Sequence, residues 1–435
     1  MRLSLAGLGL LLACSGSGRD TESPAGASPT TAQVPAEPGP GGASVPEDGG
    51  APIPAASCPA VSACPGDSAV PGIVTPLDPC AFPIEEAPTS EALAKALAGL
   101  AKPAPLPAVL ADLNRAAVPT TAVPGVPSGV TAAFRWAAED DASTTWIPQG
   151  ITGSADASAT GIVAGRRVIL VSAYHAPPGG AADKGVRLAV VDVTNPAAPS
   201  YRFALLVEPK GTVAAPTFAP VAIHAGGLAW IGDLLYVPDT NAGLRVFDLA
   251  AMLEVKTDLD VVGCVAGACR AGQYKYVVPQ VGMYRSRSAC APLFSYVGLD
   301  RGTSPPSLVT GEYCGGQACG GVPLAGRAFR WPLAREGARL AAGLSYPSQA
   351  YRLGHAQVQG LATVGGELFL SSSAPEAGKG ALFRAPVGAP SRELPWVDAP
   401  EDLLWDGARG ELWGLSEAAG ARVVFGVPRT SLAGP

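Results

Sequence analysis

From about residue 131 onward, short apolar segments alternate with turn residues. The segments are rich in Val, Leu, Ile, Phe and Tyr, and Gly, Pro and Asp separate them. Apart from a turn near Leu249, the chain there lacks the period of an amphipathic helix. This length and composition are typical of β-strands, so the sequence predicts an all-β domain. The segments are residues 167–175, 186–194, 201–208, 233–238, 244–249, 294–300, 307–313, 367–373, 381–387, 411–417 and 422–427.

A weak internal repeat favours a β-propeller over a sandwich or a barrel. In each unit a polar residue precedes glycine or an equivalent, and an apolar strand follows; most units continue with a turn and a second strand. This order is clearest in GGLAWIGDLLYV and GLATVGGELFL, and it matches the innermost hairpin of a propeller blade. The units begin near Gln149, His224, Gln280, Gln359 and Glu401.

Five units predict a propeller of five blades, and six if a degenerate blade lies within residues 255–345. The segment Phe134-Arg135-Trp136 is expected to supply an outer strand that closes the ring onto the last blade. Residues 145–427, with their WIPQGI, HAGG, VFD and PEDL segments, resemble a little-characterised group of exported bacterial proteins. More loosely, they are similar to six-bladed propellers of the NHL and lactonase type. The resemblance implies the fold and brings no reaction with it.

The amino terminus has the order of a secretory signal. Met1-Arg2 supplies a positive charge, residues 3–13 are apolar or small, and Cys14 follows. The segment LLAC resembles the lipobox of bacterial lipoproteins. That resemblance implies cleavage before Cys14, acylation with chains such as palmitate, and attachment to the cell envelope. Ser15 after the cysteine implies the outer membrane. The alternative is an ordinary cleaved signal in which Cys14 is incidental.

Composition divides the rest of the chain. Residues 14–57 lack aromatic residues and are dominated by Pro, Gly, Ala and Ser, so they predict a disordered tether. Residues 58–130 form an intermediate segment with three cysteines and two helical patterns, and Phe82 is its only aromatic residue. Because large rings dominate core energetics, we expect the propeller to span residues 131–435.

Eight cysteines remain after Cys14, and an even number in an exported chain predicts disulfides. Two pairs share one spacing, Cys264 with Cys269 and Cys314 with Cys319. The similar spacing of Cys58 and Cys64 suggests a third pair, which leaves Cys80 and Cys290 for the fourth. The pairing of these last four cysteines stays open. Zinc is the competing interpretation, although its close cysteine pairs usually have shorter gaps.

The charge excludes one class of partner. The net charge is −6, from 36 acidic and 30 basic residues, and no basic cluster occurs along the chain. A nucleic-acid-binding protein needs such a cluster to displace counterions. Beyond the amino-terminal signal, no apolar run is long enough to span a bilayer. We therefore expect a monomeric exported protein that contacts the membrane through its lipid.

The candidate site is the ring of residues that open the blades. In a propeller the innermost strands line a central channel, so these side chains are expected at one mouth, where they suit a polar ligand or an ion. A purely structural network of buried hydrogen bonds is the competing interpretation. The ring consists of Gln149, His224, Gln280, Gln359, Glu401 and Asp402.

Three further patterns carry weaker hypotheses. Asp239 and Asn241 begin like a calcium loop, but a turn with Gly243 is the simpler interpretation. The three histidines, His175, His224 and His355, are compatible with a metal site that nothing in their spacing requires. Five tryptophans are compatible with a sugar-stacking surface, although packing between blades is the commoner role. They are Trp146, Trp331, Trp396, Trp405 and Trp413.

The sequence therefore predicts a lipid-anchored binding or scaffold module that recognises an unknown protein or a small polar ligand. The alternative is a hydrolase or lactonase-like enzyme centred on the channel. In that case His224 is the candidate base, Glu401 or Asp402 holds a metal or orients the base, and calcium is the candidate cofactor. The chain has no nucleophile elbow, P-loop or zinc-protease motif, so whether it is an enzyme stays open.

Overall fold

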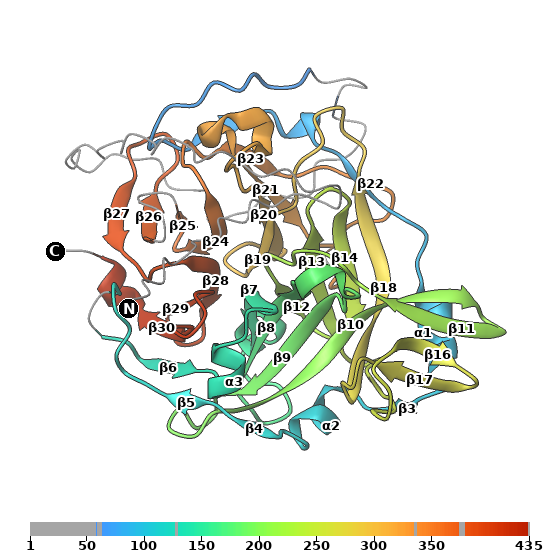
Figure 1. Ribbon diagram of the computed structural model, residues 1–435. Helices are drawn as coiled ribbons and strands as arrows, with labels where there is room; N and C mark the ends of the chain where they lie inside the picture. Colours follow the sequence, from blue (N-terminus) through green and yellow to red (C-terminus); the bar gives the residue numbers. More distant parts are fainter. Residues whose placement is uncertain (1–57, 59–62, 127–128, 335–336, 374–378, 434–435) are drawn as a thin grey trace, which may run out of the picture.

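The computed structural model describes residues 58, 63–126, 129–334, 337–373 and 379–433. These residues form five blades of four antiparallel strands each, arranged around a common axis (Figure 1). The chain is therefore an all-β propeller, as predicted. The signal segment 1–13, Cys14 and the tether 14–57 lie outside the described residues.

Each blade runs outward from its innermost strand. Blade 1 contains β7 (Trp146–Gly153), β8 (Val168–His175), β9 (Val186–Asp192) and β10 (Ser200–Thr212). Blade 2 contains β12 (Ala229–Ile231), β13 (Leu234–Asp239), β14 (Gly243–Asp248) and β18 (Tyr276–Ser286). Blade 3 contains β19 (Tyr296–Asp300), β20 (Ser307–Gly311), β21 (Arg327–Pro332) and β23 (Gln349–Arg352).

Blade 4 contains β24 (Val358–Val364), β25 (Glu367–Ser372), β26 (Ala381–Ala385) and β27 (Arg392–Pro395). Blade 5 contains β28 (Pro400–Asp406), β29 (Glu411–Ser416), β30 (Val424–Pro428) and β6 (Ala132–Arg135). Neighbouring blades pack face to face, so the strands are buried on both sides. This explains why segments such as VILV in β8 are continuously apolar rather than alternating.

The ring closes through strands from the two ends of the domain. In blade 5, the C-terminal strand β30 pairs with β6, which comes before blade 1 in the chain; Val424 lies opposite Phe134. The innermost strands β7, β12, β19, β24 and β28 follow one another around the axis, and β28 lies beside β7. The closing strand predicted at Phe134-Arg135-Trp136 is therefore confirmed, although Trp136 lies just beyond the end of β6.

One predicted unit was misplaced. Gln280 does not open a blade, because it lies on β18, the outermost strand of blade 2. The third blade begins instead at Tyr296, where the sequence lacks the polar-glycine pattern of the other units. Residues 255–345 hold the outer strand of blade 2 and most of blade 3, so their described part contains no sixth blade. The units are widely spaced here because residues 249–275 are inserted before β18 and residues 312–326 are inserted between β20 and β21. Strand β18 also pairs in parallel with β10 of blade 1.

Residues 64–119 wrap around the outside of the propeller, and we call them the belt (Figure 1). Hydrogen bonds from Gly388 N to Val74 O and from Ser391 N to Gly72 O join the belt to the chain between β26 and β27 of blade 4. It then adds an edge strand to blade 3, with β1 (Thr75–Leu77) paired to β23. On blade 2, β2 (Ile84–Glu86) pairs with β18, and β3 (Lys102–Pro103) pairs with β15 (Leu253–Glu254).

The belt continues to the two remaining blades. There β4 (Arg115–Ala116) pairs with β10 of blade 1, and β5 (Val118–Pro119) pairs with β6 of blade 5. Helices α1 (Glu91–Leu97) and α2 (Leu106–Leu110) also pack on this outer surface. The belt thus touches all five blades in turn.

The hydrophobic core begins earlier in the chain than the aromatic content suggested. Phe82 and Leu97 of the belt are fully buried. Phe82 packs on Phe329 of blade 3, with ring centroids 4.7 Å apart. The expected start near residue 131 misses this contribution, because the belt buries mostly aliphatic side chains, including Val109 of α2. The described residues 72–119 therefore pack as part of the propeller.

Four disulfides join the eight described cysteines. Cys264 pairs with Cys269 and Cys314 with Cys319, as predicted. The suggested pairing of the other four was wrong. Cys58 bonds to Cys80 and Cys64 to Cys290, because the belt runs past the loop before blade 3 instead of folding back on itself.

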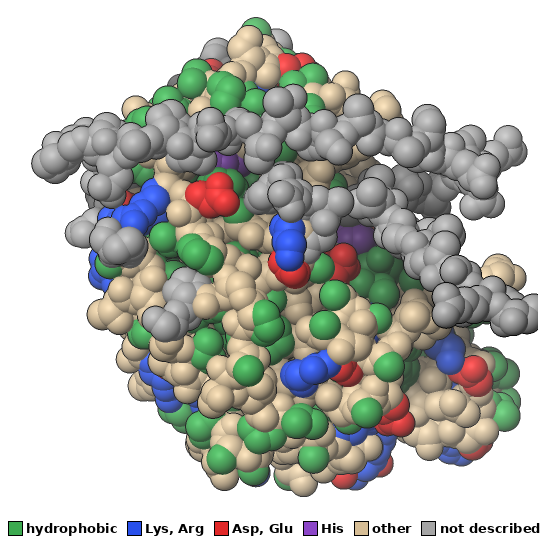
Figure 2. Space-filling model, turned by 60° about the vertical axis from the view of Figure 1, so that its left-hand side comes forward, with side chains coloured by type: hydrophobic (Ala, Val, Ile, Leu, Met, Phe, Trp, Pro, Cys, Tyr) green, Lys and Arg blue, Asp and Glu red, His purple; other side chains and the backbone are tan. Residues whose placement is uncertain are grey.

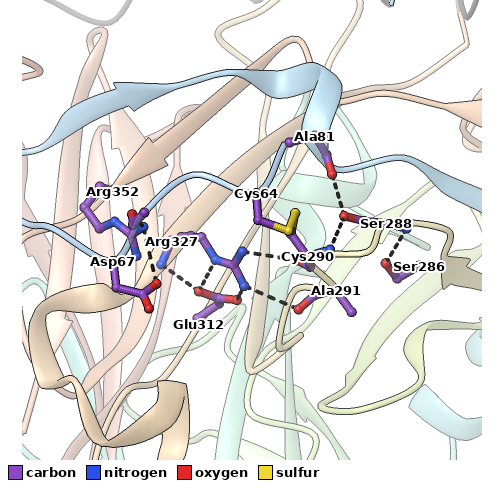
Figure 3. The surroundings of a disulfide bond; sticks show 11 residues. Cys64, Asp67, Ala81, Ser286, Ser288, Cys290, Ala291, Glu312, Arg327 and Arg352 are labelled. Carbon is purple, nitrogen blue, oxygen red and sulfur yellow. Dashed lines mark hydrogen bonds and ion pairs between the residues drawn. A yellow bond between two sulfur atoms is a disulfide. The ribbon is translucent and has the colours of Figure 1, made fainter. Parts of the chain in front are cut away.

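Ion pairs and hydrogen bonds surround the Cys64–Cys290 bond (Figure 3). Arg327 donates both to Glu312 and to the carbonyl of Cys290, the latter at 3.1 Å. Arg352 donates to the carbonyl of Gly66, two residues beyond Cys64. The disulfide therefore fastens the start of the belt to a loop that blade 3 already holds in place.

On the face drawn in Figure 2, acidic and basic side chains are interspersed rather than gathered by sign. No helix among the described residues is long and apolar enough to cross a membrane. The four disulfides fit an exported protein.

Removing the Cys64–Cys290 bond should destabilise the propeller more than removing Cys264–Cys269. The sequence separations are 226 and 5, and a disulfide that closes a longer loop restricts the unfolded chain more. Replacing both cysteines by Ala should cost about 5 kcal/mol for the first pair and about 2 kcal/mol for the second. Urea unfolding of the two double variants measures the difference, and equal losses would contradict a fastening role for the belt.

Candidate axial site

The innermost strands approach one another so closely that backbone fills the propeller axis. A Cβ atom on Gly150 of β7 would lie 2.6 Å from the carbonyl carbon of Gly227, just before β12. A Cβ atom on Gly360 of β24 would lie 2.5 Å from the Cα atom of Asp402 on β28. Side chains at these positions would force the strands apart. The open channel expected from the sequence is therefore closed at this level.

Asp402 joins three blades at the axis. Its side chain is fully buried, and its Oδ2 atom accepts hydrogen bonds from the Ile151 N–H of blade 1 at 3.0 Å and the Leu228 N–H of blade 2 at 3.3 Å. Burial raises the pKa of Asp402, and these N–H donors oppose the rise. Asp402 thus links blades 1, 2 and 5 through its Oδ2 atom, while its Oδ1 atom is buried without a hydrogen-bond partner among the described residues.

Three innermost strands carry an irregularity at the same place. The pairing register shifts between Pro148 and Ile151 in β7, between Val358 and Gly360 in β24, and between Pro400 and Leu403 in β28. A bulge of this kind re-aims the side chains within it. The residues concerned include Gln149, Gln359 and Glu401. This irregularity is the structural basis of the polar-glycine repeat in the sequence.

We call Gln149, Gln359, Glu401 and Glu417 the axial cluster. The Gln149 amide Nε2 donates to Glu417 Oε2 at 3.0 Å. The Gln359 amide Nε2 lies 3.4 Å from Glu401 Oε1. The Oε2 atom of Glu401 is buried and has no hydrogen-bond partner among the described residues. The cluster therefore offers one unsatisfied acceptor on a side chain that is 2% exposed.

Glu417 was missed by the sequence analysis, which considered only residues that open a blade. It follows β29, and its N–H donates to the Ala399 carbonyl at 3.1 Å, next to the start of β28. The pairing of Pro400 with Ser416 brings the end of one strand beside the start of the other. The hairpin 401–416 was visible in the sequence, so the residue after its second strand was a detectable candidate.

Both carboxyl groups of the cluster have raised pKa values. Burial raises the pKa of Glu401 well above its ordinary value, the charges of Glu417 and Asp402 raise it further, and the nearby Gln149 amide opposes the rise. Burial also raises the pKa of Glu417, against the opposing effects of the Gln149 hydrogen bond and the Arg422 charge. Two neighbouring acids with raised pKa values are suited to share protons or to accept a cationic donor.

His224 does not have the environment of a general base. Its ring stacks on Tyr174, with centroids 4.5 Å apart, and no acidic side chain among the described residues hydrogen-bonds to it. Burial lowers its pKa to about 4, so the imidazole is a weak base at neutral pH. The other histidines have separate partners: His355 contacts Ser391 at 2.9 Å, and His175 contacts Asp183 at 3.5 Å.

The predicted calcium loop is a hairpin turn. Asp239 and Gly243 are paired residues of β13 and β14, and Arg245 forms an ion pair with Asp239 at 2.8 Å. Asn241 is exposed at the tip of the turn. The segment therefore adopts the turn with Gly243 that the sequence analysis preferred to a calcium loop, and its carboxylate is paired with a guanidinium. Gln280 likewise accepts a hydrogen bond from Arg245, at 2.8 Å, and so belongs to this outer network and not to the ring.

One group of potential metal ligands occurs among the described residues, and it consists of Glu312, Cys314 and Cys319. The two sulfur atoms are bonded to each other, and Glu312 accepts hydrogen bonds from Arg327. A disulfide lacks the thiolates that bind metals, so this donor set does not fit an ion. No histidine takes part in such a group within the described part of the chain.

The tryptophans pack between blades, as the commoner interpretation held. Trp146, Trp331, Trp396 and Trp413 are buried, and Trp405 is half-buried. They offer no sugar-stacking surface.

Comparisons with known proteins add little to this site. No family model and no curated protein matches the chain. Among solved structures, a subtype N11 neuraminidase-like protein of A/flat-faced bat/Peru is 10% identical, with a TM-score of 0.31, and the match covers 72% of this chain and 97% of that one. A GH43_1 enzyme from Xanthomonas citri complexed with xylose is 11% identical, with a TM-score of 0.30, covering 78% and 92%.

A third neighbour is CoXyl43, a β-xylosidase/α-arabinofuranosidase from a compost metagenome, in a calcium-free form. It is 10% identical, with a TM-score of 0.31, covering 71% of this chain and 94% of that one. At such scores, neither the activity nor the calcium named for these proteins carries over to this chain. The assignment of the propeller here rests on its own strand pairing.

The buried acid Asp156, in the short helix α4 (Ser154–Ala157), should make the unfolding free energy depend on pH. Burial raises the pKa of Asp156 to about 8 from 3.8, and Thr152 donates to its carboxyl at 2.6 Å. Between these values the folded protein holds a proton that the unfolded chain has lost. The unfolding free energy therefore falls as pH rises, by about 1.4 kcal/mol per pH unit.

Asp156→Asn keeps an acceptor for Thr152 and removes the titration. Urea unfolding at pH 5, 6 and 7 should show a shallower pH dependence in this variant than in the wild type. The matched control is Asp398→Asn, at an exposed position paired with Lys379, which should keep the wild-type slope. If both variants behave like the wild type, Asp156 does not hold a proton in the folded state.

Proposed function

We propose that this chain is an exported, membrane-tethered binding module whose axial cluster recognises a cationic, amine-bearing ligand. The unpartnered Oε2 atom of Glu401 is the observation that carries this proposal. A buried acceptor without a partner costs roughly 1–3 kcal/mol, which a ligand that donates a hydrogen bond recovers.

The electrostatics of the cluster favour a cation over an anion. Glu401 and Glu417 lie close enough for the charge of one to raise the pKa of the other. A positively charged donor would replace the proton that this pair retains in the free protein. An anionic ligand would add to the repulsion.

An ammonium group fits the available acceptors better than a calcium ion does. Calcium takes six to eight oxygen ligands, whereas an ammonium group has three hydrogen atoms to donate. The two glutamates and the side-chain oxygens of Gln149 and Gln359 offer a small number of acceptors. The closed axis leaves the ligand at the mouth, so a terminal amine of a peptide side chain or a polyamine is a suitable probe.

The membrane attachment in this proposal depends on acylation of Cys14. The four disulfides use every other cysteine of the chain, which leaves Cys14 available for acylation. Two or more acyl chains would hold the protein at a membrane, and the pattern around Cys14 supports the outer membrane. A fatty-acid analogue should label the wild type and leave Cys14→Ser unlabelled.

A hydrolase is the second candidate. A buried acid with a raised pKa beside a second carboxyl group is the usual environment of a general acid, and Glu401 beside Glu417 has this arrangement. The role assigned to His224 in that hypothesis is not supported by its lowered pKa. The enzyme hypothesis therefore depends on the two glutamates.

Calorimetric titration of the full chain with spermidine tests the binding proposal. Spermidine should bind more tightly at pH 8 than at pH 6, because binding displaces a proton from the glutamate pair. Glu401→Gln should weaken binding at pH 8 at least tenfold. The matched control is Glu393→Gln, at an exposed position on β27, and its affinity should equal that of the wild type.

Two results would overturn the proposal. Spermidine binding that is absent at both pH values, or equal in Glu401→Gln and the wild type, would remove the cationic ligand from the axial cluster. Turnover of p-nitrophenyl acetate or a γ-lactone that is lost in Glu401→Gln would favour the hydrolase instead.

A further inference from the structure

Two hairpins project together from the rim of the wheel, to the right in Figure 1. The first joins β10 to β11 (Ala215–Pro220), and the second joins β16 (Val262–Val265) to β17 (Ala268–Ala271). They lie side by side, since the Cys264 N–H donates to the Thr217 hydroxyl at 2.8 Å. We call this pair of hairpins the arm.

The tip of the arm is apolar and uncharged. The segments GTVAAPTFAP (211–220) and VVGCVAGAC (261–269) contain no Asp, Glu, Lys or Arg. Val213 is 61% exposed at one turn, and Val265 is 63% exposed beside the other. Leu259 and Val261 are also exposed, so four of the nine exposed large hydrophobic side chains of the described residues lie on or next to the arm.

A disulfide near the tip and buried contacts at the root hold the arm rigidly. Cys264 and Cys269 face each other across β16 and β17 and are bonded. Phe218 of β11 is buried and packs in one cluster with Cys269 and with Leu97 of the belt helix α1. The exposed valines are therefore presented by a stiff support, and ordering them against a partner costs little entropy.

Paired charges surround the arm below its apolar tip. Lys210 pairs with Glu208 at 2.6 Å, Arg270 with Asp258 at 2.7 Å, and Lys184 with Asp260 at 2.7 Å. Three positive and three negative groups cancel. From its end toward the propeller, the arm thus changes from an apolar tip to a band of paired charges with no net charge. A bilayer changes in the same order, from its apolar interior to its charged headgroups.

We propose that the tip of the arm inserts shallowly into the lipid bilayer to which the chain is tethered. This inference rests on a membrane anchor at Cys14. Residues 14–57, as the flexible chain that their composition predicts, have an r.m.s. span of roughly 35 Å, enough for the domain to turn its rim toward the membrane. The contact would fix the orientation of the propeller, with its rim against the membrane and its two flat faces perpendicular to the membrane plane.

A protein partner fits the tip less well. Interfaces between proteins gain most of their energy from Trp, Tyr and Arg side chains set in pockets. The two tip segments contain none of these residues, and their single ring, Phe218, is buried at the root. Small aliphatic side chains instead gain free energy in proportion to the area that lipid covers, without requiring a complementary shape.

The test uses the unpaired Cys14 as an artificial anchor. The full chain is conjugated through Cys14 to maleimide-bearing lipid in phosphatidylcholine vesicles, and the reference is the same chain conjugated to a soluble maleimide. Hydrogen exchange of residues 211–216 and 264–268 should be at least tenfold slower on vesicles. This design holds the domain at a membrane whether or not cells acylate Cys14, so failure of the natural anchor and failure of the arm can be told apart.

The double variant Val213→Asp/Val265→Asp should lose the protection and keep the unfolding midpoint of the wild type. The matched control is Val118→Asp, which changes an exposed valine on the belt strand β5 and should keep the protection. Equal exchange on vesicles and in solution would overturn the proposal. Protection that appears without lipid as protein concentration rises would identify a second copy as the occupant and would also overturn it.

Discussion

The hydrogen bonds of Asp402 at the axis are the interaction on which the rest of the structure depends. One buried carboxyl group on the last blade accepts from backbone N–H groups of the first and second blades, where glycines let the strands meet. A propeller has no continuous sheet across its centre, so the innermost strands need such a link. Backbone and Asp402 fill the axis at this level, and the preceding residue of β28, Glu401, has a buried oxygen atom without a hydrogen-bond partner among the described residues.

The belt provides the corresponding constraint at the rim. It touches every blade, and the Cys64–Cys290 bond fixes its beginning. Strand β6, which comes just before blade 1 in the chain, completes blade 5. Because of this strand and the belt, the ring cannot open at one blade interface unless contacts at other blades also break. A rigid wheel held at hub and rim suits a protein that presents fixed surfaces outside the cell, and it supports both the axial cluster and the projecting arm.

The sequence predicted those features that repeat locally. Alternating strands and turns gave the propeller, the polar-glycine pattern located Gln149, Gln359 and Glu401, and equal spacing identified two disulfides. It failed where distant segments meet. Gln280 has the same polar-glycine sequence pattern as the residues that open blades, but it lies on an outer strand and accepts a hydrogen bond from Arg245 on the neighbouring strand. Glu417 reaches the cluster only because β28 and β29 pair. The Cys64–Cys290 bond depends on the path that the belt takes around the propeller, and the local composition of the belt does not reveal that path.

Denaturant unfolding of two Asp402 variants tests the central claim most directly. Asp402→Ala removes the acceptor and leaves the Ile151 and Leu228 N–H groups unpaired, so it should lower the unfolding free energy by about 2–5 kcal/mol. Asp402→Asn keeps an oxygen acceptor without a buried acid and should lose much less. If the alanine variant is as stable as the wild type, the carboxyl group does not hold the blades together and the account of the axis is wrong.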